Sequence, residues 1–159
     1  MGTTDALHAL SNDDIYLLGE GNWFRSYEKM GAHPARVEGQ AGYFFAVWAP
    51  QVKSVHVIGD FNAWDPAAAP LNVTPYGGVW QGFVPGVKEG QLYKYLIETS
   101  NGDLLYKADP YAFSAELIPG TASKTAVISG YRWRDAAWMK RRAETDHMKK
   151  PLNIFEIHL

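Results

Sequence analysis

The chain has 159 residues, of which 47% are apolar and 20% are charged; this is the composition of a globular protein and excludes a disordered or low-complexity chain. Its 15 lysines and arginines and 17 acidic residues give a net charge of −2, so it lacks the basic excess typical of nucleic-acid binders. The sequence has no cysteine, which excludes disulfides and thiolate zinc sites, and its five histidines match no metal-ligand spacing.

Residues 1–35 are predicted to form an extension of short helices and turns. Asp13 suits the start of a helix that ends at Gly19, and residues 24–30 favour a second helical piece that stops at Gly31. The segment has no signal-sequence pattern, and no apolar run approaches membrane-spanning length. We therefore expect a cytoplasmic protein with no membrane partner.

Residues 36–130 are predicted to form an antiparallel β-sandwich. From residue 42 the apolar side chains alternate, and strand-like runs follow at 43–48, 54–59, 79–84, 92–98, 104–106 and 124–128. Glycine, proline and asparagine separate these runs, and Asn101-Gly102 is a strong hairpin signal. Because no helices between the runs are available for parallel crossovers, the pattern favours antiparallel pairing.

Residues 131–150 are predicted to hold a linking helix, with Asp135 as its cap and residues 136–148 as its body. Pro151 ends this helix. Residues 151–159, PLNIFEIHL, are typical of a strand, yet the chain offers this strand no partner. We expect that the sequence is cut from a longer protein at this point.

Trp64 is the first candidate binding residue, because it lies at the tip of the loop GDFNAWD after a predicted strand. An indole in such a place can stack on the C–H face of a sugar ring while polar neighbours bond to the hydroxyls. Packing over the end of the sandwich is an equally good interpretation.

Lys94 and Tyr106 are weaker candidates. Lys94 alternates with Tyr93 and Tyr95, so it should face solvent, where its ammonium either bonds sugar oxygens or is simply hydrated. Tyr106 offers a second stacking ring or covers the core. Trp48 and Trp80 are expected to pack in the core.

No catalytic residue, metal or cofactor is predicted. The sequence contains no nucleophile elbow, no GxGxxG and no P-loop. Its strand-end carboxylates show no ordered pairing and are explained as solvated turn residues: Asp60, Asp65, Asp103, Asp109 and Glu116.

The stretch FAVWAPQVKSVHVIGDFNAWD resembles the glycogen-binding-type module at the N-terminus of isoamylase-like members of the α-amylase superfamily. The wider sequence is similar to bacterial 1,4-α-glucan (glycogen) branching enzymes over YLLGEGNWFRSYEKMGAHP, LYKYLIETSNGDLLYKADPYAFSAELIPGTAS, YRWRDAAWMKRRA and PLNIFEIHL. The resemblance covers nearly everything from Ile15 to Leu159.

The resemblance implies an immunoglobulin-like sandwich followed by a helix and the first strand of a missing catalytic (β/α)₈ barrel. That barrel would hold the catalytic carboxylates, so the 159 residues alone should be inactive. The implied partners are α-glucan, as glycogen or maltooligosaccharide, and the chain's own missing barrel.

The sugar-facing residues of related glycogen-binding modules are a Trp, a Lys, a second aromatic and an Asn. The first two fall on Trp64 and Lys94, the third falls near Tyr106, where Tyr replaces the usual Trp, and the fourth falls near Ser123.

Three alternatives remain on the sequence alone: a regulatory glycogen-binding module without an enzyme, the module of a debranching or trehalose-releasing hydrolase, and a spacer whose aromatic residues are all core.

Overall fold

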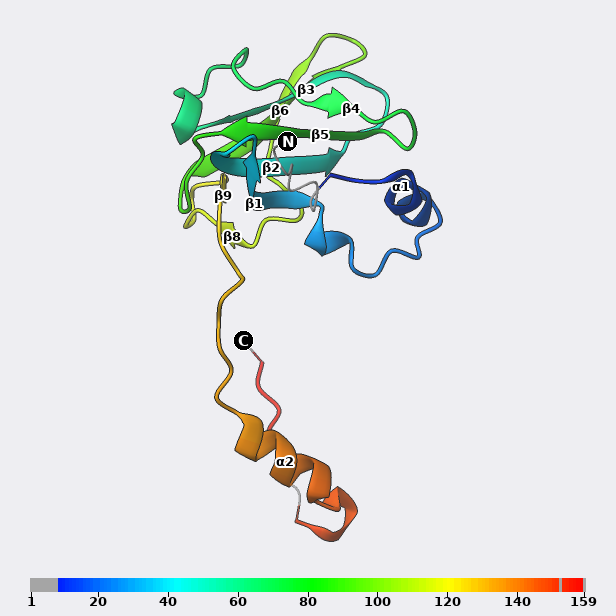
Figure 1. Cartoon of the computed structure of the whole chain (residues 1–159), viewed down its shortest axis with the longest axis vertical. Coiled ribbons are helices and arrows are strands. Elements are labelled where there is room, and N and C mark those ends of the chain that lie inside the picture. The colour runs from blue at the N-terminus through cyan, green and yellow to red at the C-terminus, as the bar shows by residue number, and fades with distance from the viewer. Residues whose placement is uncertain (1–8, 152, 159) are drawn as a thin grey trace. The chain divides into compact units, whose positions relative to one another are not determined.

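The structure is a computed structural model, and it describes residues 9–151 and 153–158. It divides into two units, residues 1–127 and 128–159. Most of the chain belongs to the first unit, which contains both sheets (Figure 1).

The N-terminal segment forms one short α-helix, α1 (Asn12–Gly19), and a 3₁₀ turn, η2 (Ser26–Glu28). The cap is Ser11 and not the expected Asp13: the Ser11 hydroxyl accepts the Asp14 N–H at 3.2 Å, and the Asp14 carboxylate accepts the Ser11 N–H at 2.8 Å. This reciprocal capping box satisfies two helix-end donors. The second helical piece predicted over residues 24–30 is reduced to the single turn η2.

The first sheet contains four antiparallel strands in the order β1-β2-β5-β4. Their bounds are β1 (Gly31–Val37), β2 (Gln40–Trp48), β4 (Asn72–Val73) and β5 (Val79–Pro85). Strand β1 was not predicted and begins within the expected extension. It lies at the edge of the sheet, where Pro34 is tolerated because the outer side of an edge strand makes no ladder bonds.

The second sheet is built around β6 (Leu92–Thr99), which pairs with β3 (Val52–Gly59), β7 (Leu104–Lys107) and β9 (Ser123–Lys124). Strand β9 also pairs with β8 (Ser114–Ala115). The strand expected at residues 124–128 is thus reduced to a two-residue strand. A 3₁₀ turn, η3 (Asp60–Asn62), follows β3 directly.

The predicted sandwich is confirmed by a core that joins the two sheets. Its centre contains Phe45 from β2 and Tyr93 from β6, whose rings meet edge to face with centroids 5.2 Å apart. The other buried core side chains follow the predicted alternation along their strands: Tyr43, Val47, Val55, Val57 and Tyr95.

A second cluster covers the outer face of the first sheet. Ile15 of α1 and Met30 pack against Ala46 of β2 and Val79 of β5. The N-terminal segment therefore belongs to the same compact unit as the sandwich, and it positions α1 beside the end of β2.

The second unit contains α2 (Ala136–Glu144) and a 3₁₀ turn, η4 (His147–Lys149). The predicted helix is confirmed but ends earlier, and Asp135 makes no side-chain capping bond. Residues 153–158 pair with no strand in the described part of the chain, while Leu152 and Leu159 lie outside it. Their assignment to a barrel strand stays a prediction.

Candidate functional site

The loop that carries Trp64 is tightly constrained. Asn62 accepts the N–H of Gly59 at 2.9 Å and donates to the Val57 carbonyl at 2.9 Å, which closes the turn after β3. Ala63 and Trp64 then adopt left-handed φ values of 51° and 60°, a costly backbone conformation for residues other than glycine. The side chain of Trp64 remains 37% exposed, so the structure places the indole at the surface.

Asp60 connects this loop to the start of β6. One carboxylate oxygen accepts the Trp64 indole N–H at 3.2 Å, and the other accepts the Leu92 N–H at 2.9 Å. Leu92 and Lys94 lie two residues apart on β6 and therefore share a face of the sheet. Asp60 therefore connects the Trp64 loop to the part of β6 that carries Lys94.

Lys94 is held in place and is not simply hydrated. It lies opposite Ile58 in the β3–β6 register, and its ammonium donates to the Thr121 hydroxyl at 2.7 Å. Tyr106 lies on β7 opposite Leu96 and is exposed. By strand alternation Lys94 and Tyr106 share the outer face of the second sheet. We call Trp64, Lys94 and Tyr106 the Trp64 site.

Ser123 does not belong to this surface, because it is only 1% exposed. Its hydroxyl accepts the N–H of Asp109 at 2.7 Å inside the fold. The role of sugar ligand expected for Ser123 therefore has no support, and we leave this residue out of the proposed site. Thr121, two residues before Ser123, is exposed and bonds Lys94.

The loop between β8 and β9 presents two apolar side chains that the sequence reasoning missed. Leu117 is 89% exposed and Ile118 is 95% exposed, a few residues from Thr121. The run Leu117-Ile118-Pro119-Gly120 contains the signal: two large apolar residues lie in a turn, where polar residues are usual.

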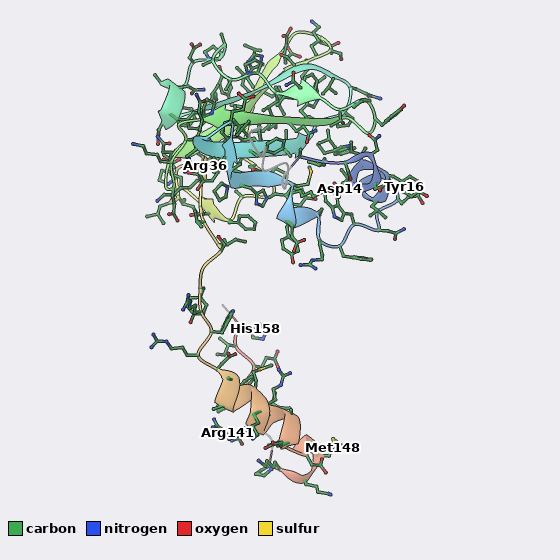
Figure 2. All side chains as sticks on the ribbon, viewed as in Figure 1. Asp14, Tyr16, Arg36, Arg141, Met148 and His158 are labelled. Atoms are coloured by element: carbon green, nitrogen blue, oxygen red, sulfur yellow. The ribbon has the colours of Figure 1, made fainter. Side chains whose placement is uncertain are left out.

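A second surface lies between α1 and the turn before β5, and we call it the aromatic groove. Tyr16, Trp48 and Tyr76 are all exposed around two adjoining cavities of about 490 and 260 Å³. Both cavities are lined by Ile15 and Gly77. Figure 2 labels Tyr16 on α1.

The indole of Trp48 is fixed, because its N–H donates to the Gly77 carbonyl at 2.7 Å. The expectation that Trp48 packs in the core is wrong, since this side chain is 58% exposed. Trp80, by contrast, packs against the core as predicted.

Asp109 is the one buried carboxylate in the described part of the chain, and its contacts are structural. It accepts the hydroxyls of Tyr93 at 2.6 Å and Tyr95 at 3.2 Å and the N–H of Tyr111 at 2.8 Å. Burial raises the pKa of this carboxyl, although the three bonds act in the opposite direction. Burial, and next the charge of Asp109, raises the pKa of both tyrosines, so their hydroxyls remain protonated donors.

The described residues form no group of three or more metal-ligating side chains. No helix within residues 9–151 and 153–158 is long and apolar enough to cross a membrane. Exposed aromatic rings beside fixed hydrogen-bonding groups suit the binding of a neutral polar ligand with flat apolar faces, such as a sugar chain.

The family profile of carbohydrate-binding module 48, the isoamylase N-terminal domain, matches residues 29–112, more than half of the chain. The chain belongs to this family. The match begins just before β1 and ends just after Asp109, so it includes Trp64, Lys94 and Tyr106. The module 48 assignment thus confirms the expected resemblance.

Similar proteins include 1,4-alpha-glucan branching enzymes GlgB. That of Butyrivibrio fibrisolvens is 47% identical over 150 residues, covering 94% of this chain and 24% of that protein. That of Rubrobacter xylanophilus is 50% identical over 151 residues, covering 94% of this chain and 21% of that protein. The chain therefore spans less than a quarter of the length of these relatives.

Among solved structures, a protein described as an alpha amylase from Salmonella typhimurium is similar with a TM-score of 0.50. It is 19% identical, and the match covers 69% of this chain and 16% of that one. This likeness concerns the fold alone.

Proposed function

We propose that this chain is the α-glucan-binding N-terminal module of a cytoplasmic bacterial glycogen branching enzyme. The observation that supports the proposal is that Asp60 connects the exposed Trp64 to the start of β6, the strand that carries Lys94, on a module 48 sandwich. The identity to GlgB proteins over 94% of the chain, including the second unit, supports the assignment of the parent.

The Trp64 site offers the two kinds of contact that a sugar chain needs. The exposed indole of Trp64 stacks on the C–H face of a glucose ring, while the Lys94 ammonium donates to its hydroxyls. Tyr106 extends this surface along β7 by a second ring.

The aromatic groove is proposed as a second contact surface for the same ligand. The groove is lined by the hydrogen-bonding side chains of Asn12, Tyr16 and Tyr76, and its one charged lining residue, Glu20, disfavours an anionic ligand. The Trp64 site and the aromatic groove lie beyond opposite ends of β3, whose eight residues span about 26 Å. A long glucan can therefore contact the two sites independently.

Weak binding is sufficient for this role. A millimolar dissociation constant corresponds to about −4 kcal/mol, and attachment to the enzyme converts later encounters into intramolecular ones with a raised effective concentration. The module would hold glucan near the catalytic barrel and brace that barrel.

The parent reaction is proposed to be a retaining double displacement: an α-1,4 bond is cut, a covalent glycosyl-enzyme forms on a carboxylate, and the chain is transferred to a 6-hydroxyl. Retention requires two carboxyl groups about 5 Å apart across the scissile bond. We assign this chemistry to the barrel, and the 159-residue chain is expected to be inactive.

The test is a titration of the ¹⁵N-labelled chain with maltoheptaose in which the indole N–H resonances are monitored by NMR. Replacements of Trp64 and Trp48 by phenylalanine assign the two resonances, so each surface is measured separately in one sample. Both resonances should shift with millimolar constants. If 20 mM maltoheptaose moves neither resonance, the binding free energy is weaker than about −2.3 kcal/mol, and glucan binding by this module is refuted.

Trp64→Ala should weaken binding at this site by up to about tenfold, because a stacked ring contributes about 0.5–1.5 kcal/mol. In this variant the signals of Tyr106 and Lys94 replace the lost indole as reporters. The Trp48 resonance should titrate as in the wild type, and it serves as the internal control.

Two rival functions lead to different outcomes. A regulatory module without an enzyme has no use for the second unit, whose sequence is shared with the branching enzymes. The module of a debranching or trehalose-releasing hydrolase would also bind glucan. Sequencing the gene beyond residue 159 distinguishes these cases by the catalytic segments that follow.

A further inference from the structure

The hairpin formed by β8 and β9 has little regular structure to fix its loop. Each strand has two residues, and the pairs Ser114 with Lys124 and Ala115 with Ser123 are its only ladder positions. Two further backbone bonds lie in the hairpin: the Glu116 N–H donates to the Ala122 carbonyl at 2.9 Å, and the Gly120 N–H donates to the Leu117 carbonyl at 2.8 Å. The shape of residues 117–121 therefore depends on contacts within the loop.

Glu116 supplies such a contact. Its carboxylate turns back across the hairpin and accepts the Ala122 N–H at 3.2 Å. A Cβ atom added to Gly120 would collide with this carboxylate, and the three nearest atoms it would meet all belong to Glu116. The backbone of Gly120 is not left-handed, so the position of Glu116 is the reason that a side chain does not fit there.

The residues fixed in this way border the Trp64 site. The hydroxyl of Thr121, which follows Gly120, accepts a hydrogen bond from the Lys94 ammonium at 2.7 Å. Leu117 and Ile118, which follow Glu116, are almost fully exposed on the same loop.

We propose that Glu116 is a positioning residue for glucan binding at the Trp64 site: its bond to the Ala122 N–H fixes the loop so that Thr121 holds Lys94 for the ligand. This inference rests on the proposed function. Glu116 itself does not contact the sugar. Its effect on affinity therefore passes through the loop and reaches only the Trp64 site.

The first test titrates Glu116→Ala with maltoheptaose and follows the two indole resonances. Loss of one charge-assisted hydrogen bond should weaken binding at the Trp64 resonance about fivefold, while the Trp48 resonance titrates as in the wild type. Glu116→Gln should restore most of the affinity, because its amide oxygen can still accept the Ala122 N–H. A role in overall stability would affect both resonances together.

The second test is a double-mutant cycle with Gly120. Gly120→Ala should weaken binding at the Trp64 resonance by displacing the Glu116 carboxylate. In the Glu116→Ala background the obstacle is gone, and the same glycine replacement should cause no further loss.

Equal binding by the wild type and Glu116→Ala, or losses that add in the double variant, would overturn the positioning role. Either result is distinct from failure of the proposed function, in which maltoheptaose moves neither indole resonance of the wild type. Thermal unfolding of each variant checks that the chain remains folded at the titration temperature.

Discussion

Replacing Asp109 by alanine should be the most destabilising single change of a carboxylate in this chain. Its two oxygens accept three donors, two of which are hydroxyls of the fully buried Tyr93 and Tyr95. Each buried donor left without a partner costs about 1–3 kcal/mol. Removal of a desolvated carboxylate returns part of this loss, so the free energy of unfolding should fall by about 3 kcal/mol.

The assay is urea unfolding at pH 7, followed by tryptophan fluorescence, with Asp103→Ala as the control because Asp103 is an exposed turn residue. The control should change stability by less than about 0.5 kcal/mol. Asp109→Asn should lose less than Asp109→Ala, since its amide still offers an acceptor to the Tyr111 N–H. An alanine variant as stable as the control would refute the reasoning.

The same carboxyl makes a signed prediction for pH. Its pKa is raised in the folded state, so between the ordinary value of 3.8 and the folded value the folded chain binds more protons than the unfolded chain. The contribution of Asp109 to the free energy of unfolding should therefore fall as pH rises through this window. The wild type should lose stability relative to Asp109→Asn from pH 4 upward, and a difference that is flat with pH would contradict the shift.

Three further predictions concern the two surfaces and the chemistry. Gly77→Ala should cost about 2 kcal/mol of stability and weaken glucan binding at Trp48, because Gly77 has φ +77° and a Cβ there would lie 2.6 Å from Ile15. The control is Gly86→Ala, which has the same φ and open space around it and should therefore show the cost of backbone strain alone. Equal losses of stability in the two variants would exclude an effect of the contact with Ile15. Lys94→Met should weaken binding at the Trp64 resonance about threefold by removing one charged donor, whereas Lys53→Met should not. The purified 159-residue chain should leave the iodine spectrum of amylose unchanged, and a spectral change would contradict its predicted inactivity.

The central strands could be predicted because burial of one face imposes a period of two. Tyr43, Phe45 and Val47 alternate on β2 and all enter the core. Strand β1 could not be found in this way, since small residues and Pro34 give it no apolar alternation. Its existence depends on pairing with β2, which becomes visible only in the fold.

The same limit applies to the candidate site. Strand alternation correctly placed Lys94 on the outer face, but its partner Thr121 lies 27 residues away, and only the pairing of β6 with β9 brings the two together. Ser123 lies in the two-residue strand β9 and Thr121 lies in the loop before it, so the sequence could not decide which of the two is buried. Trp48 was expected in the core, but strand alternation places it on the face of β2 opposite Val47, where α1 covers Ala46 and leaves Trp48 exposed.

The indole rings of both tryptophans in the proposed sites are held by hydrogen bonds at the ring edge. The Trp64 indole N–H donates to Asp60, and the Trp48 indole N–H donates to the Gly77 carbonyl. A side chain that is already ordered loses little conformational entropy when a ligand stacks on it, and an immobilised side chain otherwise costs about 0.5–1.5 kcal/mol. For the proposed binding free energy of about −4 kcal/mol this saving is a large fraction of the total, so we expect the fixed rings to matter as much for glucan binding as the number of contacts.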